Sequence, residues 1–313
     1  MNHVNANSEI KISIIVLVYN HEKYLERALN SIICQQHDFP IEILIGDDCS
    51  SDRSPEIIKK FEQSNCNSNQ HVRTFIRNKN FGAAFNVSHL ANLSNGKYIT
   101  FLEGDDYWCS DTKLIKQFEF LQSNPDYIAV THPLRVEDLS GNFVFNTPSS
   151  YSHIFTLENF LRGKRFPLTA AMIRKNNEEI QHVSSLISKG PRNAADVTWC
   201  FYLLSKSDVY ILSEPMAAYN MRVMGGESNY NSISTDLRKC EDRLLMLDIN
   251  NNEYQLGGRM LYLYSQLFKR VVFSFRLSLA DQLSFFRIFA KVFKGLTFSF
   301  FGWAYNFFYD GKK

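Results

Sequence analysis

Cysteine patterns typical of zinc sites and of disulfide frameworks are missing from this sequence of 313 residues. None of its six cysteines stands in a C-x-x-C pair or at zinc-ligand spacing, the six being Cys34, Cys49, Cys66, Cys109, Cys200 and Cys240. Scattered cysteines in a chain of this length are typical of reduced thiols in a cytosolic protein. Residues 1–9 are polar, so we expect a disordered N-terminus without the apolar core of a secretory signal peptide.

Long hydrophobic runs are also absent. In the C-terminal part, the longest uncharged run covers residues 295–309, and a membrane-spanning helix needs about 20 apolar residues. Residues 258–313 carry nine Lys or Arg against two acids, a balance of +7 in a chain whose net charge is +2. This segment is rich in phenylalanine as well. We therefore expect residues 241–313 to form a helical extension that associates with an anionic membrane surface. A helical cap on the main domain or a dimer interface is the alternative.

Missing features of the sequence argue against three classes of protein that bind nucleic acids or nucleotides. A net charge of only +2 argues against a dedicated nucleic-acid-binding protein. No G-x-G-x-x-G follows the first apolar run, which argues against a dinucleotide-binding dehydrogenase. The same loop, Tyr19-Asn20-His21-Glu22, has neither the glycines nor the basic residues that a nucleotidyltransferase would need.

Apolar runs and helical patterns alternate through the first hundred residues. Residues 12–18, 41–45, 72–76 and 98–102 are rich in β-branched and aromatic residues, as buried strands are. Helices are expected between them, one capped by Ser54 with Pro55 in its first position and one over residues 83–93, stopped by Asn95 and Gly96. The pattern predicts an α/β domain over residues 10–240, with a mostly parallel sheet flanked by helices.

Acidic side chains follow two of the predicted strands. Asp47 and Asp48 end the second strand, and Glu103, Asp105 and Asp106 follow the fourth. Ligands of parallel sheets lie beyond the carboxyl ends of the strands, so both groups are expected in one cleft. Carboxylates gathered there suit Mg²⁺ or Mn²⁺. The alternatives are an ordinary acidic turn at residues 103–106 and a helix-capping turn at residues 47–48.

Asp196 is a further candidate carboxylate. It precedes an apolar helical pattern over residues 196–204, and a strand is predicted over residues 209–212. On its position alone, Asp196 is read as a helix N-cap.

Together these pieces resemble the family 2 glycosyltransferases. The resemblance covers about residues 12–228 and rests on the order and spacing of its motifs. These are Val16-Leu17-Val18-Tyr19-Asn20-His21, Gly46-Asp47-Asp48-Cys49-Ser50-Ser51-Asp52, Asn80-Phe81-Gly82 and Glu103-Gly104-Asp105-Asp106-Tyr107-Trp108. It implies the GT-A fold, a Rossmann-like α/β architecture, and sugar transfer with inversion of configuration.

The resemblance also implies roles for individual residues. The nucleotide-binding residues would be Leu17, Tyr19, Asp47, Asp48, Asn80, Glu103, Asp105 and Arg222, with Asp48 and its neighbour Asp47 at the base and ribose. Glu103 stands where the family commonly has Asp, and its longer side chain assigns the direct metal ligand to Asp105 or Asp106. Asp196 matches the position of the catalytic base, and Arg222 would hold the diphosphate.

The sequence thus predicts transfer of a sugar from a nucleotide diphosphate sugar, with a UDP-sugar favoured, to a saccharide or lipid-linked hydroxyl in surface polysaccharide synthesis. The protein is expected in the cytoplasm, at the inner face of the membrane. Substrate choice would depend on loops such as residues 134–147 and 164–169. The alternative is a non-catalytic nucleotide-sugar-binding or scaffold protein anchored by its tail.

Overall fold

The structure is a computed structural model, and it describes residues 9–65, 69–138, 140–147, 153–161, 164, 166–190, 195–220, 249 and 253. The predicted disorder of residues 1–8, Arg222 and the predicted C-terminal helices lie outside this part of the chain. No helix within the described ranges combines the length and the apolar character that crossing a membrane requires.

The centre of the fold is an eight-stranded sheet in the order β3-β2-β1-β4-β10-β6-β11-β9. Its parallel half contains β3 (Gln70–Ile76), β2 (Ile41–Asp47), β1 (Ile12–Val18) and β4 (Tyr98–Glu103). The other half contains β10 (Met172–Arg174), antiparallel to both its neighbours, then β6 (Ala129–Thr131), β11 (Val209–Ile211) and β9 (Ile154–Phe155). All four predicted strands of the first hundred residues are present, so the prediction of a mostly parallel sheet is confirmed there.

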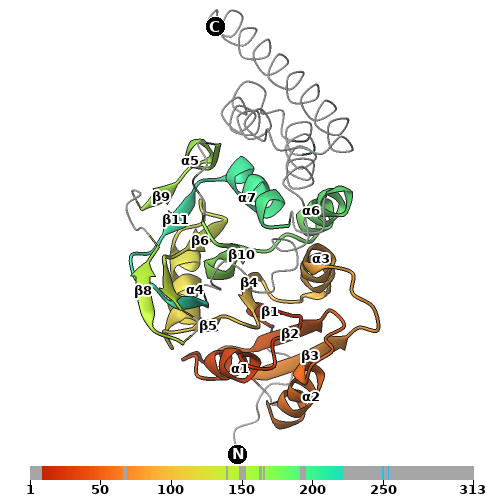
Figure 1. Ribbon diagram of the computed structural model, residues 1–313. Coiled ribbons are helices and arrows are strands. Elements are labelled where there is room, and N and C mark those ends of the chain that lie inside the picture. Colours follow the sequence, from red (N-terminus) through yellow and green to blue (C-terminus); the bar gives the residue numbers. More distant parts are fainter. Residues whose placement is uncertain are drawn as a thin grey trace, which may run out of the picture.

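Helices cover both faces of this sheet (Figure 1). On one face, α1 (Leu25–Ile33), α2 (Ser54–Asn65) and α4 (Lys113–Ser123) bury Leu25, Ile58 and Leu114 against the even-numbered apolar residues of β1. On the other face, α3 (Ala83–Leu93), α6 (Asn177–Lys189) and α7 (Ala195–Lys206) pack on Ile15 and Phe101. The short α5 (Leu157–Leu161) and η1 (Leu168–Ala170) belong to this second layer.

A second sheet of four strands stands beside the acidic end of β4. Its order is β5-β12-β7-β8, with β5 (Tyr107–Trp108), β12 (Ala217–Asn220), β7 (Leu134–Glu137) and β8 (Phe143–Asn146). The buried carboxylate of Glu137 joins it to α1: it accepts hydrogen bonds from Tyr107 Oη and Arg135 Nε, both at 2.8 Å, and Arg27 lies 3.8 Å away. The sheet therefore has a fixed position at the edge of the main domain.

Two local expectations were wrong. Ser54 is the first residue inside α2 and not its N-cap, and its hydroxyl accepts a hydrogen bond from the His21 backbone N–H at 3.0 Å. Gly96 does not end α3, which stops at Leu93. A β-carbon on Gly96 would lie 2.5 Å from the Ser13 nitrogen, so the residue is small because β1 passes close to it. In both cases a tertiary contact decided the choice of residue.

Lys113, at the start of α4, is fully buried below the sheet. Its ammonium group donates to Gln117 Oε1 at 2.7 Å and Thr100 Oγ1 at 3.1 Å and lies 4.4 Å from the ring centre of Trp108. Burial lowers the pKa of Lys113 to about 7. Between pH 7 and the ordinary lysine pKa of about 10.4, the unfolded chain therefore holds a proton on Lys113 that the folded chain has lost.

We expect the free energy of unfolding to rise with pH in this window. Only the unfolded chain still binds a proton at Lys113, and a rising pH makes that bound proton less favourable. Between pH 7 and pH 9, Lys113 should add on the order of 2 kcal/mol to the free energy of unfolding. Urea unfolding of wild type and Lys113→Met at both pH values measures this contribution, and Lys116→Met, an exposed lysine of the same helix, is the control. An equal pH dependence in wild type and Lys113→Met would contradict the assignment.

Candidate active site

The loops that follow β1 and β2 are joined by hydrogen bonds between the motif residues of both. Asn20 Oδ1 accepts from the Ser51 N–H at 2.8 Å, and the Asn20 N–H donates to Ser50 Oγ at 2.8 Å. The Glu22 N–H donates to Asp52 Oδ2 at 2.9 Å. Asn20 has a φ of 57°, a left-handed conformation that asparagine tolerates well. These contacts hold the two loops as one rim at the carboxyl end of the sheet.

Asp47 and Asp48 are engaged with the backbone of neighbouring loops. Asp47 is fully buried and accepts hydrogen bonds from the N–H and hydroxyl of Ser50, while burial raises the pKa of its carboxyl. The Asp48 carboxylate accepts from the Phe81 N–H at 2.9 Å and the Gly82 N–H at 2.7 Å. Gly82 has a φ of 92°, which favours glycine. Both aspartates therefore hold loops in place, and their contact with a base or ribose stays a prediction.

The predicted acidic group forms a real cluster after β4. Carboxylate oxygens of Glu103, Asp105 and Asp106 lie within 4.8 Å of one another. Gly104 permits this tight turn: its N–H donates to the Leu17 carbonyl oxygen at 2.8 Å, and a β-carbon on it would lie 2.8 Å from His21 Nδ1. Hard carboxylate oxygens at this spacing fit Mg²⁺ or Mn²⁺, so the donor set matches the expected ion.

Two neighbours hold the acidic cluster in place. His21 Nε2 lies 3.7 Å from Asp105 Oδ1. Asp106 is buried, and its Oδ1 accepts a hydrogen bond from the Asn220 backbone N–H at 3.1 Å. The Asn220 side chain in turn donates to the Asp105 carbonyl oxygen. Strand β12 therefore meets the acidic turn directly.

Asp196 reaches the same place through the packing of α7 on β4. Side chains alternate along a strand, so Glu103 lies on the same face as Phe101. Phe101 packs edge to face against Trp199 of α7, with ring centres 5.8 Å apart. Asp196 precedes Trp199 by three residues and shares its helix face. The first turn of α7 thereby brings a carboxylate to the side of Glu103, 93 residues away in the sequence.

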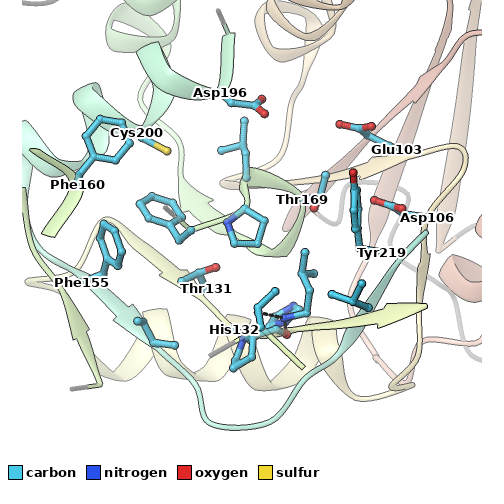
Figure 2. Close-up of a pocket in the computed structure, with 18 of the residues that line it drawn as sticks. Glu103, Asp106, Thr131, His132, Phe155, Phe160, Thr169, Asp196, Cys200 and Tyr219 are labelled. Atoms are coloured by element: carbon cyan, nitrogen blue, oxygen red, sulfur yellow. Dashed lines mark hydrogen bonds between the residues drawn. The ribbon is translucent and has the colours of Figure 1, made fainter. Parts of the chain in front are cut away.

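Two cavities adjoin these carboxylates, and Figure 2 shows the larger one. The larger, of about 570 Å³, is lined by Glu103, Asp106 and Asp196, and the smaller, of about 190 Å³, by Leu17, Glu103 and Asp196. The exposed surface of Asp196 faces these cavities, while the protein around them raises the pKa of its carboxyl by desolvation. A carboxylate with a raised pKa in a cleft is a suitable general base.

The structure brings together five of the ten site residues predicted from the sequence. Glu103, Asp105, Asp106 and Asp196 converge, and Leu17 lines the smaller cavity. Both loops expected to govern substrate choice contribute to the larger cavity, with Leu134, Val136, Phe145, Thr147, Phe166, Pro167, Leu168 and Thr169. Tyr19 and Asn80 are half-buried, and no contact in the structure assigns them a function.

Sequence reasoning gave no role to several neighbours of the site. His21 ends the first family motif, so its place near the site could have been predicted from the sequence. The structure places it against Asp105. Tyr219 and Asn220 stand three and two residues before Arg222, the one residue of this segment to which the family resemblance assigned a role. His132, Val197 and Cys200 line the larger cavity without any sequence signal, because the cavity is formed between elements.

A doubly covered α/β sheet with clustered carboxylates at its carboxyl edge and a further carboxylate across a cavity is the arrangement expected for the GT-A fold. The comparison with protein families agrees. The sequence model described as Glycosyl transferase family 2 matches residues 13–180, and the chain belongs to this family.

Solved structures and relatives extend this result. The structure of S. aureus TarS 1–349 in complex with UDP-GlcNAc superposes with a TM-score of 0.67 at 18% identity, covering 92% of this chain and 82% of TarS 1–349. The mannosyltransferase PcManGT of Pyrobaculum calidifontis, in complex with GDP-Man and Mn²⁺, gives 0.52 at 13% identity, with 99% and 90% covered. TuaG of Bacillus subtilis, named for teichuronic acid biosynthesis, is 28% identical over 213 residues, 67% of this chain and 79% of TuaG.

The chain spans 63% of the length of the Mycobacterium relatives that it matches. Its likeness to the two solved structures, each below 20% identity, establishes the GT-A fold that the sequence predicted.

Removing one carboxylate from the acidic cluster should weaken metal binding. We expect Asp105→Asn and Asp106→Asn to lower the affinity for Mn²⁺ in the presence of UDP by roughly tenfold or more, because each change removes a charged oxygen ligand while keeping the side-chain size. Titration followed by electron paramagnetic resonance of free Mn²⁺ measures the affinity.

Asp126→Asn is the matched control, since Asp126 is exposed and outside the cluster. It should bind Mn²⁺ as the wild type does. Unchanged Mn²⁺ affinity in both cluster variants would show that the ion does not bind there.

Proposed function

We propose that this glycosyltransferase moves a sugar from a nucleotide diphosphate sugar, with a UDP-sugar favoured, to a hydroxyl of a saccharide or lipid-linked acceptor, with inversion at the anomeric carbon. The observation that carries this proposal is the meeting of Glu103, Asp106 and Asp196 at one cavity. One side of that cavity has a donor set for a divalent ion, and the other has a carboxylate of raised pKa.

The residues divide the reaction between them. Asp105 and Asp106 would hold the ion, with Glu103 beside them, and His21 and Asn220 would keep the turn in position. A bound Mg²⁺ or Mn²⁺ would neutralise negative charge on the leaving diphosphate. Asp196 would accept the proton of the acceptor hydroxyl as that oxygen attacks the anomeric carbon from the face opposite the diphosphate. The attacking oxygen gains the glycosidic bond, and the bond to the diphosphate breaks.

Two features support a role in surface polysaccharide synthesis. TuaG, a relative by sequence, is named for teichuronic acid biosynthesis. The C-terminal part of this chain has the charge and aromatic content that suit the inner face of a membrane. Arg222, outside the described residues, would pair with the diphosphate, and Tyr19, Asp47, Asp48 and Asn80 would border the nucleotide.

A non-catalytic nucleotide-sugar-binding or scaffold protein is the second candidate. It shares the donor site but would have no use for Asp196 beside the acidic cluster. Turnover therefore separates the two functions, since the scaffold would bind nucleotide without releasing nucleotide diphosphate from any donor.

Asp196→Asn should abolish sugar transfer and keep nucleotide binding. We expect the transfer rate to fall roughly 100-fold or more, the usual contribution of a general base, because the amide cannot accept the proton. A screen of donors with Mn²⁺ and Mg²⁺, reading nucleotide diphosphate release, measures turnover, and calorimetry with UDP measures binding. Asp208→Asn, an exposed aspartate near the end of α7, is the control. Full activity of Asp196→Asn would remove the base assignment.

The rate should also depend on pH through Asp196. A base must be deprotonated, so kcat should fall as the pH drops through the pKa of Asp196, and desolvation by the surrounding protein raises that pKa above the ordinary 3.8. A pH profile of kcat for wild type, together with the residual rate of Asp196→Asn, checks this. If the residual rate of Asp196→Asn falls at low pH in the same way as the wild-type rate, a group other than Asp196 causes the pH dependence.

We further propose that residues 241–313 attach the protein to the inner face of the cytoplasmic membrane. Residues 258–313 carry nine Lys or Arg against Asp281 and Asp310, and each basic residue near an anionic surface contributes about 1 kcal/mol. Sedimentation with anionic liposomes should retain the full chain and lose a chain ending at Gly258. Equal sedimentation of both chains would count against this attachment.

A further inference from the structure

Two exposed aromatic side chains stand on the wall that the second sheet gives to the larger cavity. Phe145 of β8 is 46% exposed and Tyr219 of β12 is 43% exposed, and both line the cavity that also contains Asp196. Among the large apolar side chains that are exposed in the described part of the chain, these two line it. Leaving the rings in water costs free energy that a ligand covering them would recover.

The strand register places both rings in one row. Val136 of β7 is the register partner of Tyr219 in β12 and of Phe145 in β8, and directly paired residues point to the same face of a sheet. Val136 is 3% exposed and forms the buried middle of the row. Because neighbouring strands lie about 4.8 Å apart, the two rings follow one another across about 10 Å of the sheet. We call these three residues the aromatic strip.

A β-bulge in β8 separates Phe145 from Phe143, the other exposed ring of this strand. The register shifts before Glu137, which pairs with Phe143, and Val144 is the extra residue. Phe143 therefore lies on the face of Arg135, whose guanidinium carbon is 4.9 Å from the centre of its ring. In a regular strand, Phe143 and Phe145 would share a face. The bulge thus leaves one exposed phenylalanine on each face of the same strand.

The same cavity also offers hydrogen-bonding groups from other elements. The carboxylate of Asp196 comes from α7 and the hydroxyl of Thr169 follows from η1. Tyr219 precedes Asn220, whose N–H donates to Asp106, so this end of the aromatic strip lies at the acidic cluster. Figure 2 shows the ring of Tyr219 next to Asp106. A fitting ligand therefore has an apolar face for the rings and polar groups at its edge.

A pyranose ring has this two-sided character. Its axial C–H bonds form an apolar face that packs on aromatic rings, while the hydroxyls around its edge donate and accept hydrogen bonds. An alkyl chain would cover the rings but would leave the polar groups of the cavity without partners. Two aromatic rings that follow one another across the sheet suit two adjoining sugar rings.

We propose that the aromatic strip binds two adjoining sugars of a saccharide acceptor, with the reacting sugar on Tyr219 and the next sugar on Phe145. This inference rests on the proposed function, because it takes Asp196 as the group that meets the acceptor hydroxyl and the acidic cluster as the donor side. It makes Phe145 a determinant of acceptor length. A single sugar occupies only the part of the strip at Tyr219.

Binding of matched glycosides to the full-length chain tests the proposal. Methyl glycosides of glucose, mannose and N-acetylglucosamine are compared with those of cellobiose, mannobiose and chitobiose in the presence of UDP and Mn²⁺, by saturation-transfer NMR and calorimetry. At least one disaccharide should bind roughly fivefold more tightly than its monosaccharide, because its second ring covers Phe145. The strongest saturation should fall on the C–H protons of the ring faces.

Variants of the two exposed rings separate their contributions. Phe145→Ala should remove the advantage of the disaccharide and keep monosaccharide binding, whereas Phe145→Tyr retains a ring and should keep the advantage. Tyr219→Leu should weaken both sugars roughly fivefold. Phe143→Ala is the matched control, since Phe143 is 51% exposed on the opposite face of the same strand, and it should bind as the wild type does. Circular dichroism verifies that each variant is folded.

The outcomes separate this inference from the proposed function. Nucleotide diphosphate release by a protein without any disaccharide advantage would overturn the aromatic strip and leave the transferase intact. An advantage that survives Phe145→Ala, or that Phe143→Ala removes equally, would also overturn it. Stronger binding of n-hexanol than of any disaccharide, lost in Phe145→Ala, would make the strip an alkyl-binding surface instead. A disaccharide advantage lost in Phe145→Ala, in a protein that turns over no donor, would retain the sugar site and refute the transferase assignment.

Discussion

The packing of α7 against β4 is the contact on which the site depends. Phe101 and Trp199 meet edge to face in the core, and this one aromatic pair sets how far the first turn of α7 lies from the end of β4. Glu103 follows Phe101 by two residues on the strand face, and Asp196 precedes Trp199 by one turn of the helix. The apolar core thus fixes the spacing of two carboxylates that would otherwise repel each other.

Around this contact, polar groups are used in two distinct ways. Asp47, Asp48 and Asp52 hold loops by accepting backbone hydrogen bonds, so their charge is compensated within the protein. Glu103 and Asp196 line the cavities instead, where a ligand can meet them. The family motifs therefore combine scaffold residues with residues that can do chemistry. A motif match alone does not tell the two kinds apart.

The second sheet gives the site its other boundary. Strand β12 ends at Asn220, which contacts the backbone and side chain of the acidic turn, while β7 and β8 supply part of the larger cavity wall. Glu137 joins this sheet to α1 through Tyr107, and the pKa of Tyr107 is raised to about 12 by burial and by the nearby carboxylate. This wall of the cavity is consequently tied both to α1 and to the acidic turn.

The sequence by itself determined the parallel half of the sheet and the acidic cluster, because strand alternation, short loops and carboxylates at strand ends are local patterns. It also indicated Asp196, through its family position. Only the tertiary structure decided that Asp47 and Asp48 anchor loops, that Ser54 binds the β1 loop, and that one cavity joins Glu103, Asp106 and Asp196. These features arise where segments far apart in the chain meet, and no local pattern records which partners will come together there.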